Sequence, residues 1–238
     1  LHISLTAEMF YTRNPDTKNI DHNPDYLNKA SRYFPLIGWI VGGLSFVVYS
    51  LSAVVFSVEL AIILSMITGI LVTGAFHEDG FADVCDGFGG GWTKEKILTI
   101  MKDSAIGAYG AIGLILLFVL KYQGLQQLIV GSDAHNSAID YPQMIILLLF
   151  VAGHSVSRLG AISIVFTHNY SREDASSKSK PIAQSFSWRE VVGSLFFGLF
   201  PLVLLSLFQW QILLVLIPVF LMRFFLARYF QKWIDGYT

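Results

Sequence analysis

The feature that most constrains this fold is a long segment, Phe34 to Val58, that contains no charged side chain. A helix needs about 20 apolar residues to cross the hydrocarbon core of a bilayer, where it satisfies its own backbone polar groups. The composition agrees with such a segment, because 54% of the residues are hydrophobic and 14% are charged, with a mean hydropathy of +0.57. Soluble domains carry roughly 25% charged residues. We therefore expect a membrane protein.

Five further apolar segments raise the expected number of spans to about six. Glycines in the first span would permit close helix contact, and apolar spacing at the start of the chain predicts a short amphipathic helix. The expected fold is all-α: a polytopic membrane helix bundle with about six transmembrane helices plus an N-terminal amphipathic helix, in a single integral-membrane domain over residues 1–238. The further spans are Leu60–Phe76, Ala105–Leu120, Gln143–Phe166, Val191–Phe208 and Gln211–Met222; the glycines are Gly38, Gly42 and Gly43; the amphipathic helix is Leu1–Tyr11.

The charges indicate which side of the membrane each loop faces. Nearly every lysine and arginine falls on the side that receives both chain ends, the aspartate-rich stretch and the loop Thr167–Glu190; the exceptions are Lys121 and Arg158. The positive-inside rule makes this side cytoplasmic. A net charge of −1 indicates no strong field for nucleic acid. The single cysteine, Cys85, excludes an internal disulfide framework, and no cleavable signal peptide is visible at the start.

Three aspartates in the stretch His77–Gly91 are the strongest candidates for chemistry. Asp79, Asp83 and Asp86 stand at offsets of four and three residues, which places their carboxylates on one face of an α-helix. Like charges on one face repel unless cations lie between them. Carboxylate oxygens suit Mg²⁺, which keeps coordination positions for substrate phosphates. We therefore predict that all three bind Mg²⁺; the alternative is an acidic, solvated helix end, which is disfavoured because the acids follow the apolar run rather than precede it.

The residues around the aspartates allow more than one interpretation. Gly80 and Gly87 would let the backbone approach a phosphate closely. Gly89–Gly91 fit a mobile loop or a plain helix stop equally well. His77 lies on the opposite side of a regular helix from Asp79, so packing is as good an account of it as catalysis.

Basic residues supply candidate phosphate contacts. Arg158 lies within an apolar span, where an ionisable residue is costly and usually functional; it would contact the substrate phosphate or the aspartates, or else have a structural partner in the membrane. His154 lies one turn away on the same face. Arginine binds phosphate with two parallel hydrogen bonds and lysine adds a point charge, although anionic lipid headgroups would attract the same lysines. The candidates in the long polar loop are Arg172, Lys178 and Lys180.

The aspartate stretch resembles the signature HxDGxxDxxDG of the cobalamin synthase family, the adenosylcobinamide-GDP ribazoletransferases. The resemblance touches almost the whole chain, and the aspartate motif is its most specific part. The further matching residues are Thr12-Arg13-x-Pro15, Phe34-Pro35-Leu36-Ile37-Gly38, Ile100-Met101-Lys102-Asp103-Ser104 with Gly107 and Gly110, Ser157-Arg158, Tyr170-x-Arg172-Glu173, and Gly236-Tyr237-Thr238.

The resemblance implies one reaction. Adenosylcobinamide-GDP and α-ribazole, or its 5′-phosphate, would give adenosylcobalamin, or its phosphate, and GMP, by attack of a ribose hydroxyl on the cobinamide-side phosphorus. Such chemistry requires mainly positioning and charge stabilisation. The resemblance places the active site on the cytoplasmic face of a bacterial inner membrane and adds Lys102, Asp103 and Arg13 as substrate-binding candidates. An aspartate of the cluster or His77 would serve as general base, and a homo-oligomer is left open.

Three other functions use related features. CDP-alcohol phosphotransferases and UbiA-type prenyltransferases also place aspartate-rich Mg²⁺ motifs on membrane helices, but the first require DGxxAR and the second a further DxxxD-like motif that is missing here. A divalent-cation channel or transporter would need acids in the middle of a span. The family pattern also continues past Thr238 to a Gly-Asp pair, so either the sequence is trimmed or that acidic contribution is absent.

Overall fold

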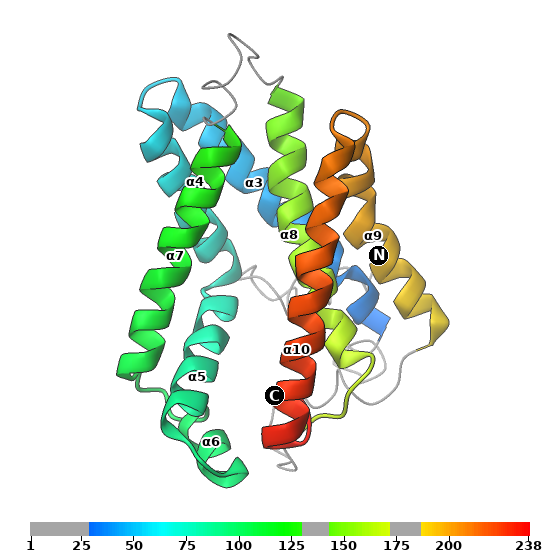
Figure 1. The fold of residues 1–238 in the computed structure, drawn as a ribbon. Helices are drawn as coiled ribbons and strands as arrows, with labels where there is room; N and C mark the ends of the chain where they lie inside the picture. Colours follow the sequence, from blue (N-terminus) through cyan, green and yellow to red (C-terminus); the bar gives the residue numbers. More distant parts are fainter. Residues whose placement is uncertain (1–28, 130–142, 172–186) are drawn as a thin grey trace, which may run out of the picture. The chain divides into compact units, whose positions relative to one another are not determined.

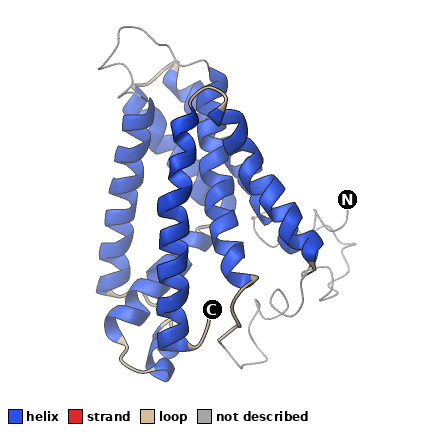
Figure 2. Cartoon of the chain, turned by 45° about the vertical axis from the view of Figure 1, so that its right-hand side comes forward, coloured by secondary structure: helices blue, strands red, loops and turns tan. Residues whose placement is uncertain are grey.

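The computed structural model describes residues 29–129, 143–171 and 187–238. In these ranges the regular structure is helical (Figure 2), and the one sheet-like pairing is a single parallel bridge between Tyr170 and Tyr237. The all-α prediction is therefore confirmed. The predicted N-terminal amphipathic helix, Leu1–Tyr11, lies outside the described residues. The chain forms two compact units, Leu1–Gly42 with Leu148–Thr238, and Gly43–Leu147.

The first unit is built on close contact between helices α3 (Phe34–Ala53) and α8 (Gln143–Val165). A Cβ atom added at Gly38 would lie 2.6 Å from the carbonyl oxygen of His154, and one at Gly42 would lie 2.8 Å from that of Phe150. Two glycines four residues apart thus let two backbones touch, as small residues do in membrane helices. Gly43 meets nothing within 4 Å, so the prediction of close contact holds for two of the three glycines. The elements in chain order are η1 (Ser31–Tyr33), the first part of α3 (Phe34–Ala53), the later part of α8 (Gln143–Val165), α9 (Trp188–Ser206), η3 (Trp210–Val215) and α10 (Leu216–Ile234).

Polar contacts hold the start of α9 and its middle in place. Ser187 and Glu190 form a reciprocal capping box at the N-terminus of α9, a pattern that their three-residue spacing encodes. The buried Glu190 carboxylate also pairs with Arg32 of η1. Further along, the indole N–H of Trp39 donates to the carbonyl oxygen of Phe197 at 2.8 Å.

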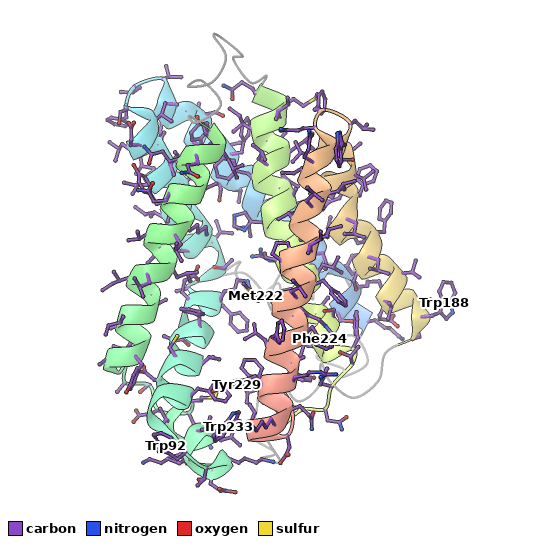
Figure 3. All side chains as sticks on the ribbon, in the orientation of Figure 1. Trp92, Trp188, Met222, Phe224, Tyr229 and Trp233 are labelled. Atoms are coloured by element: carbon purple, nitrogen blue, oxygen red, sulfur yellow. The ribbon has the colours of Figure 1, made fainter. Side chains whose placement is uncertain are left out.

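Helix α10 is longer than the sequence predicted. The sequence indicated a span ending at Met222, whereas the helix continues to Ile234. Arg223 does not end it, because its guanidinium donates to the hydroxyl and carbonyl oxygens of Ser163 in α8 at 3.2 and 3.1 Å. Large apolar side chains project from α10 (Figure 3), and Met222 and Phe225 are each 64% exposed. Such a face suits lipid contact.

The second unit contains the aspartate-rich stretch. Helices α5 (Phe76–Gly90) and α7 (Ala108–Ile129) run side by side (Figure 1), and α6 (Lys94–Ile100) packs against the end of α5. The elements are the later part of α3, α4 (Val58–Thr73), α5 (Phe76–Gly90), α6 (Lys94–Ile100), α7 (Ala108–Ile129) and the first residues of α8.

A sharp bend of 88° separates α4 from α5. Gly74 caps α4 in the left-handed conformation (φ 65°), and Ala75 follows at φ 60°, so two consecutive residues turn the chain. The predicted span Leu60–Phe76 is therefore wrong in its extent. Its helix ends at Thr73 and, at 1.5 Å per residue, is about 24 Å long, shorter than the roughly 30 Å hydrocarbon core.

Five described helices are long and apolar enough to cross a membrane, and a sixth span results if the bent pair α4–α5 counts as one. The protein is therefore a multi-pass membrane protein, and the expected number of about six spans agrees with this range. The five are residues Ser31–Ala53, Ala108–Ile129, Gln143–Val165, Trp188–Ser206 and Trp210–Ile234.

Candidate functional site

The aspartates lie on a helix of their own rather than at the end of a membrane span. Helix α5 starts at Phe76, and Glu78 and Asp79 occupy its first turn. Acidic side chains are stabilised there by the positive end of the helix dipole. The acidic residues were expected to follow an apolar span, but the bend at Gly74 ends that helix and places them at the start of a new one.

The three aspartates differ in their surroundings. Asp79 is exposed, Asp83 is half-buried and Asp86 is 9% exposed. All three belong to α5, as the four- and three-residue spacing predicted. The same helix face therefore runs from an exposed position at Asp79 to a buried one at Asp86.

Asp86 binds the N-terminus of α7. One of its carboxylate oxygens accepts the backbone N–H of Gly107 at 2.7 Å, and the other accepts that of Gly110 at 2.8 Å. These are donors that the start of a helix otherwise leaves without a partner. Sequence reasoning missed this contact, which joins residues 21 and 24 positions apart.

The structure does not gather the three carboxylates into one metal site. Among the residues that the structure describes, no group of three or more His, Cys, Asp or Glu side chains is placed to hold a metal ion. Asp79 and Asp83 remain one helical turn apart on α5. Two carboxylates are a donor set that suits Mg²⁺, which commonly takes one or two together with waters and substrate phosphates.

Most glycines of α5 serve packing. A Cβ at Gly87 would lie 2.5 Å from the Met101 side chain, and one at Gly89 would lie 2.5 Å from the Tyr109 ring. Gly80 meets nothing within 4 Å and leaves open space beside Asp79. Gly91 is the C-cap of α5, so of the two readings for Gly89–Gly91 the structure shows the helix stop.

Lys102 and Asp103 lie in the short connection between α6 and α7, and both are exposed. The Asp103 carboxylate accepts the backbone N–H of Ala105 at 3.1 Å, which fixes the local turn. Both residues thus belong to the same unit as the aspartates and precede the α7 end that Asp86 binds.

His77 and Arg158 lie in different units. His77 is half-buried in the first turn of α5, and its ring meets Phe76 edge-on at 5.5 Å. Arg158 is 4% exposed within α8; its guanidinium donates to the carbonyl oxygen of His154 at 3.0 Å and lies 5.9 Å from the centre of the Phe34 ring. Arg158 is therefore a buried cation in an apolar span, as its position predicted.

Comparison with known proteins gives an extended match. The sequence profile described as cobalamin-5-phosphate synthase matches residues 4–238. A protein of Leptospira interrogans, named adenosylcobinamide-GDP ribazoletransferase, is 46% identical over 97% of this chain and 84% of its own length. Proteins with the same name from Shewanella frigidimarina and Shewanella pealeana are 42% and 43% identical over the whole of this chain and 87% of theirs.

The chain belongs to the cobalamin-5-phosphate synthase family. It is therefore an enzyme of the transferase class, as the resemblance implied. No solved structure matches the chain.

Two motifs of the cobalamin-5-phosphate synthase resemblance meet in the first unit. The backbone N–H of Tyr237 donates to the carbonyl oxygen of Asn169 at 3.1 Å, and that of Ser171 donates to the carbonyl oxygen of Tyr237 at 2.8 Å. The Ser171 hydroxyl also donates to Ile234. This pairing joins residues 169–171 to the segment that follows α10.

Four predicted site residues of this cobalamin-5-phosphate synthase family member lie outside the described ranges. Their contribution to a site stays a prediction. They are Arg13, Arg172, Lys178 and Lys180.

Three evenly spaced glycines at the start of α7 have a packing role that was not predicted from the sequence. Gly107, Gly110 and Gly113 recur every three residues and meet α5 at Asp86 and Cys85. The family resemblance pointed to the first two without assigning a role. The three-residue spacing on an apolar helix is the signal that could have identified the packed face.

Proposed function

We propose that this protein joins adenosylcobinamide-GDP to α-ribazole or its 5′-phosphate, giving adenosylcobalamin or its 5′-phosphate and GMP. The proposal rests on the family match over residues 4–238. It also rests on relatives that are named adenosylcobinamide-GDP ribazoletransferase and are 41–46% identical to this chain. The ribose hydroxyl attacks the cobinamide-side phosphorus, the bond from that phosphorus to the GMP oxygen breaks, and the hydroxyl proton is lost to a base.

Asp79 and Asp83 are the proposed Mg²⁺ ligands. Asp79 is exposed and Asp83 half-buried, one turn apart on α5, and this supports the role because a Mg²⁺ ion there would keep positions open to a diphosphate. A bound Mg²⁺ would supply charge neutralisation at the diphosphate. Gly80, which meets no neighbour within 4 Å, leaves room for the substrate beside Asp79.

The remaining residues bind and orient substrate in this proposal. Lys102 is exposed in the connection before α7 and offers its ammonium group to a phosphate oxygen. Arg158 is buried in α8, its guanidinium donates to the carbonyl oxygen of His154, and it is the proposed contact for a substrate phosphate. His77 and Asp103 are kept as further candidates near the aspartates.

The proposed location is the inner membrane of a bacterium, with the site on the cytoplasmic side. Several apolar helices support a multi-pass protein. The concentration of Lys and Arg on one set of loops supports the orientation, and nucleotide substrates are present on that side.

The experiment is a GMP-release assay with the purified full chain in lipid nanodiscs. Adenosylcobinamide-GDP and α-ribazole are supplied with Mg²⁺ or with EDTA. We expect GMP release that needs both substrates and Mg²⁺. Release of CMP from a CDP-alcohol, or of diphosphate from a prenyl donor, with no GMP from adenosylcobinamide-GDP, would replace this function by one of the two other membrane transferases.

A further inference from the structure

We infer that Asp86 is a positioning residue that clamps the N-terminus of α7 onto α5, and that it is not a Mg²⁺ ligand. The inference deepens the proposed function and rests on it for its catalytic consequence. Its structural basis is the pair of hydrogen bonds from the Gly107 and Gly110 backbones, one to each oxygen of the Asp86 carboxylate.

The surroundings of Asp86 fit an anchor better than a ligand. The residue is 9% exposed, whereas Asp79 on the same helix is exposed. Both oxygens face a helix start, where main-chain N–H groups and the helix dipole stabilise a negative charge. The repulsion expected among three crowded carboxylates is thus relieved at Asp86 by α7 itself.

Glycines at the start of α7 lie against this carboxylate. A Cβ at Gly107 would lie 2.4 Å from an Asp86 oxygen, and its three nearest neighbours all belong to Asp86. A Cβ at Gly110 would lie 2.4 Å from the other Asp86 oxygen, and one at Gly113 would lie 2.7 Å from the Cys85 sulfur. The absence of side chains at these positions lets α7 approach α5 closely enough for both hydrogen bonds.

The contact between Asp86 and the start of α7 lies close in the chain to the proposed substrate-binding residue Lys102. Gly107 follows the Lys102–Ser104 connection by three residues, and the Asp103 turn to Ala105 links the two. Asp83 and Asp79 lie on the same helix as Asp86, about one and two turns toward its start, respectively. Holding Gly107 at Asp86 therefore sets the position of Lys102 relative to the proposed Mg²⁺ ligands.

The first test compares thermal unfolding of nanodisc-embedded Asp86→Asn and Asp83→Asn proteins, with and without Mg²⁺. In Asp86→Asn an amide NH₂ replaces one acceptor oxygen and faces a backbone N–H, so we expect a midpoint several degrees below the parent in metal-free buffer. The rise in midpoint on adding Mg²⁺ should persist in Asp86→Asn and be lost in Asp83→Asn. A parental midpoint with a lost Mg²⁺ response in Asp86→Asn would overturn the inference and make Asp86 a ligand.

The second test is a double-mutant cycle between Asp86→Ala and Gly107→Ala, read as unfolding midpoints. Gly107→Ala should lower the midpoint of the parent but have much less effect in the Asp86→Ala protein, because the clashing atoms are gone. The matched control is Gly124→Ala on the same helix, where a Cβ meets nothing within 4 Å; it should not lower the midpoint. Additive effects of Asp86→Ala and Gly107→Ala would contradict the contact.

The third test distinguishes a positioning role of Asp86 in catalysis from an effect on protein stability alone. At a temperature where Asp86→Asn is fully folded, turnover should fall at least about tenfold, which corresponds to roughly 1.4 kcal/mol, while the Mg²⁺ concentration for half activity stays at the parental value. Parental turnover would limit Asp86 to folding and overturn the positioning role. Because the first two tests need no substrate, absence of GMP release in the parent would reject the proposed reaction without affecting them.

Discussion

Gly38 lies directly against the main chain of His154, and a Cβ at Gly38 would come within 2.6 Å of the His154 carbonyl oxygen. The contact fixes the crossing of α3 and α8 four residues before Arg158. Since the neighbour is backbone, it cannot move aside as a flexible side chain would. A side chain at position 38 must therefore push the two helices apart.

Gly38→Ala should destabilise the protein by about 1–3 kcal/mol, the range for overpacking a closely packed contact. Gly43→Ala is the matched control on the same helix, since a Cβ there meets nothing within 4 Å; alanine should be neutral or stabilising. Thermal unfolding in nanodiscs measures both. Equal midpoints for the two variants would show that α3 and α8 do not touch at Gly38.

Asp79→Asn and Asp83→Asn should each remove most GMP release, and the double variant should lose little more. Ligands of one ion act as a unit, so their effects do not add. Both variants should accumulate in the membrane normally, because removing one of two nearby like charges relieves repulsion. Turnover and expression are measured together. An Asp83→Asn enzyme with parental turnover would exclude that residue from the mechanism.

Arg158→Lys should lower turnover at least about tenfold, or roughly 1.4 kcal/mol, with little change in the folded fraction. Lysine keeps the charge but lacks the planar group that can bind His154 and a phosphate at once. Arg189→Lys is the control, because Arg189 is an exposed residue in the first turn of α9. Parental turnover in both variants would assign Arg158 to packing against Phe34.

Burial raises the pKa of Tyr237 to about 12 from its usual value of 10, with the neighbouring Tyr170 as a second cause. Above pH 10 the unfolded state therefore loses a proton that the folded state keeps, so stability falls between about pH 10 and pH 12. Tyr237→Phe should lessen this fall and leave neutral-pH stability close to parental. Unfolding midpoints from pH 9 to pH 11.5 check this. Identical profiles would show that Tyr237 does not contribute.

The loop Thr167–Glu190 is predicted to face the cytoplasm. In a Cys85→Ser background, Ser176→Cys should react with a membrane-impermeant maleimide in inverted vesicles and not in intact spheroplasts. The same protein solubilised in detergent serves as the control for reactivity. Labelling confined to spheroplasts would reverse the topology and place the site outside.

The sequence by itself determined the fold class, the aspartate helix and the family. Apolar length and the scarcity of charge require membrane helices whatever their packing, and the spacing of Asp79 and Asp83 is a property of one helix. The bend was partly encoded as well, since Gly74 after an apolar run is a common C-cap. What the pattern did not indicate is that Ala75 also adopts the left-handed conformation and that α5 then starts anew.

Only the tertiary structure decided the role of Asp86. Along the sequence it is a third equivalent carboxylate, yet in space its partners are the backbone N–H groups of Gly107 and Gly110. Helical periodicity predicts which residues of one helix share a face. It does not predict which other helix covers that face, or which residues along the face are covered. Those two choices are made by packing between helices, where the small residues of α7 allow it to approach one end of the aspartate row and leave the other end exposed.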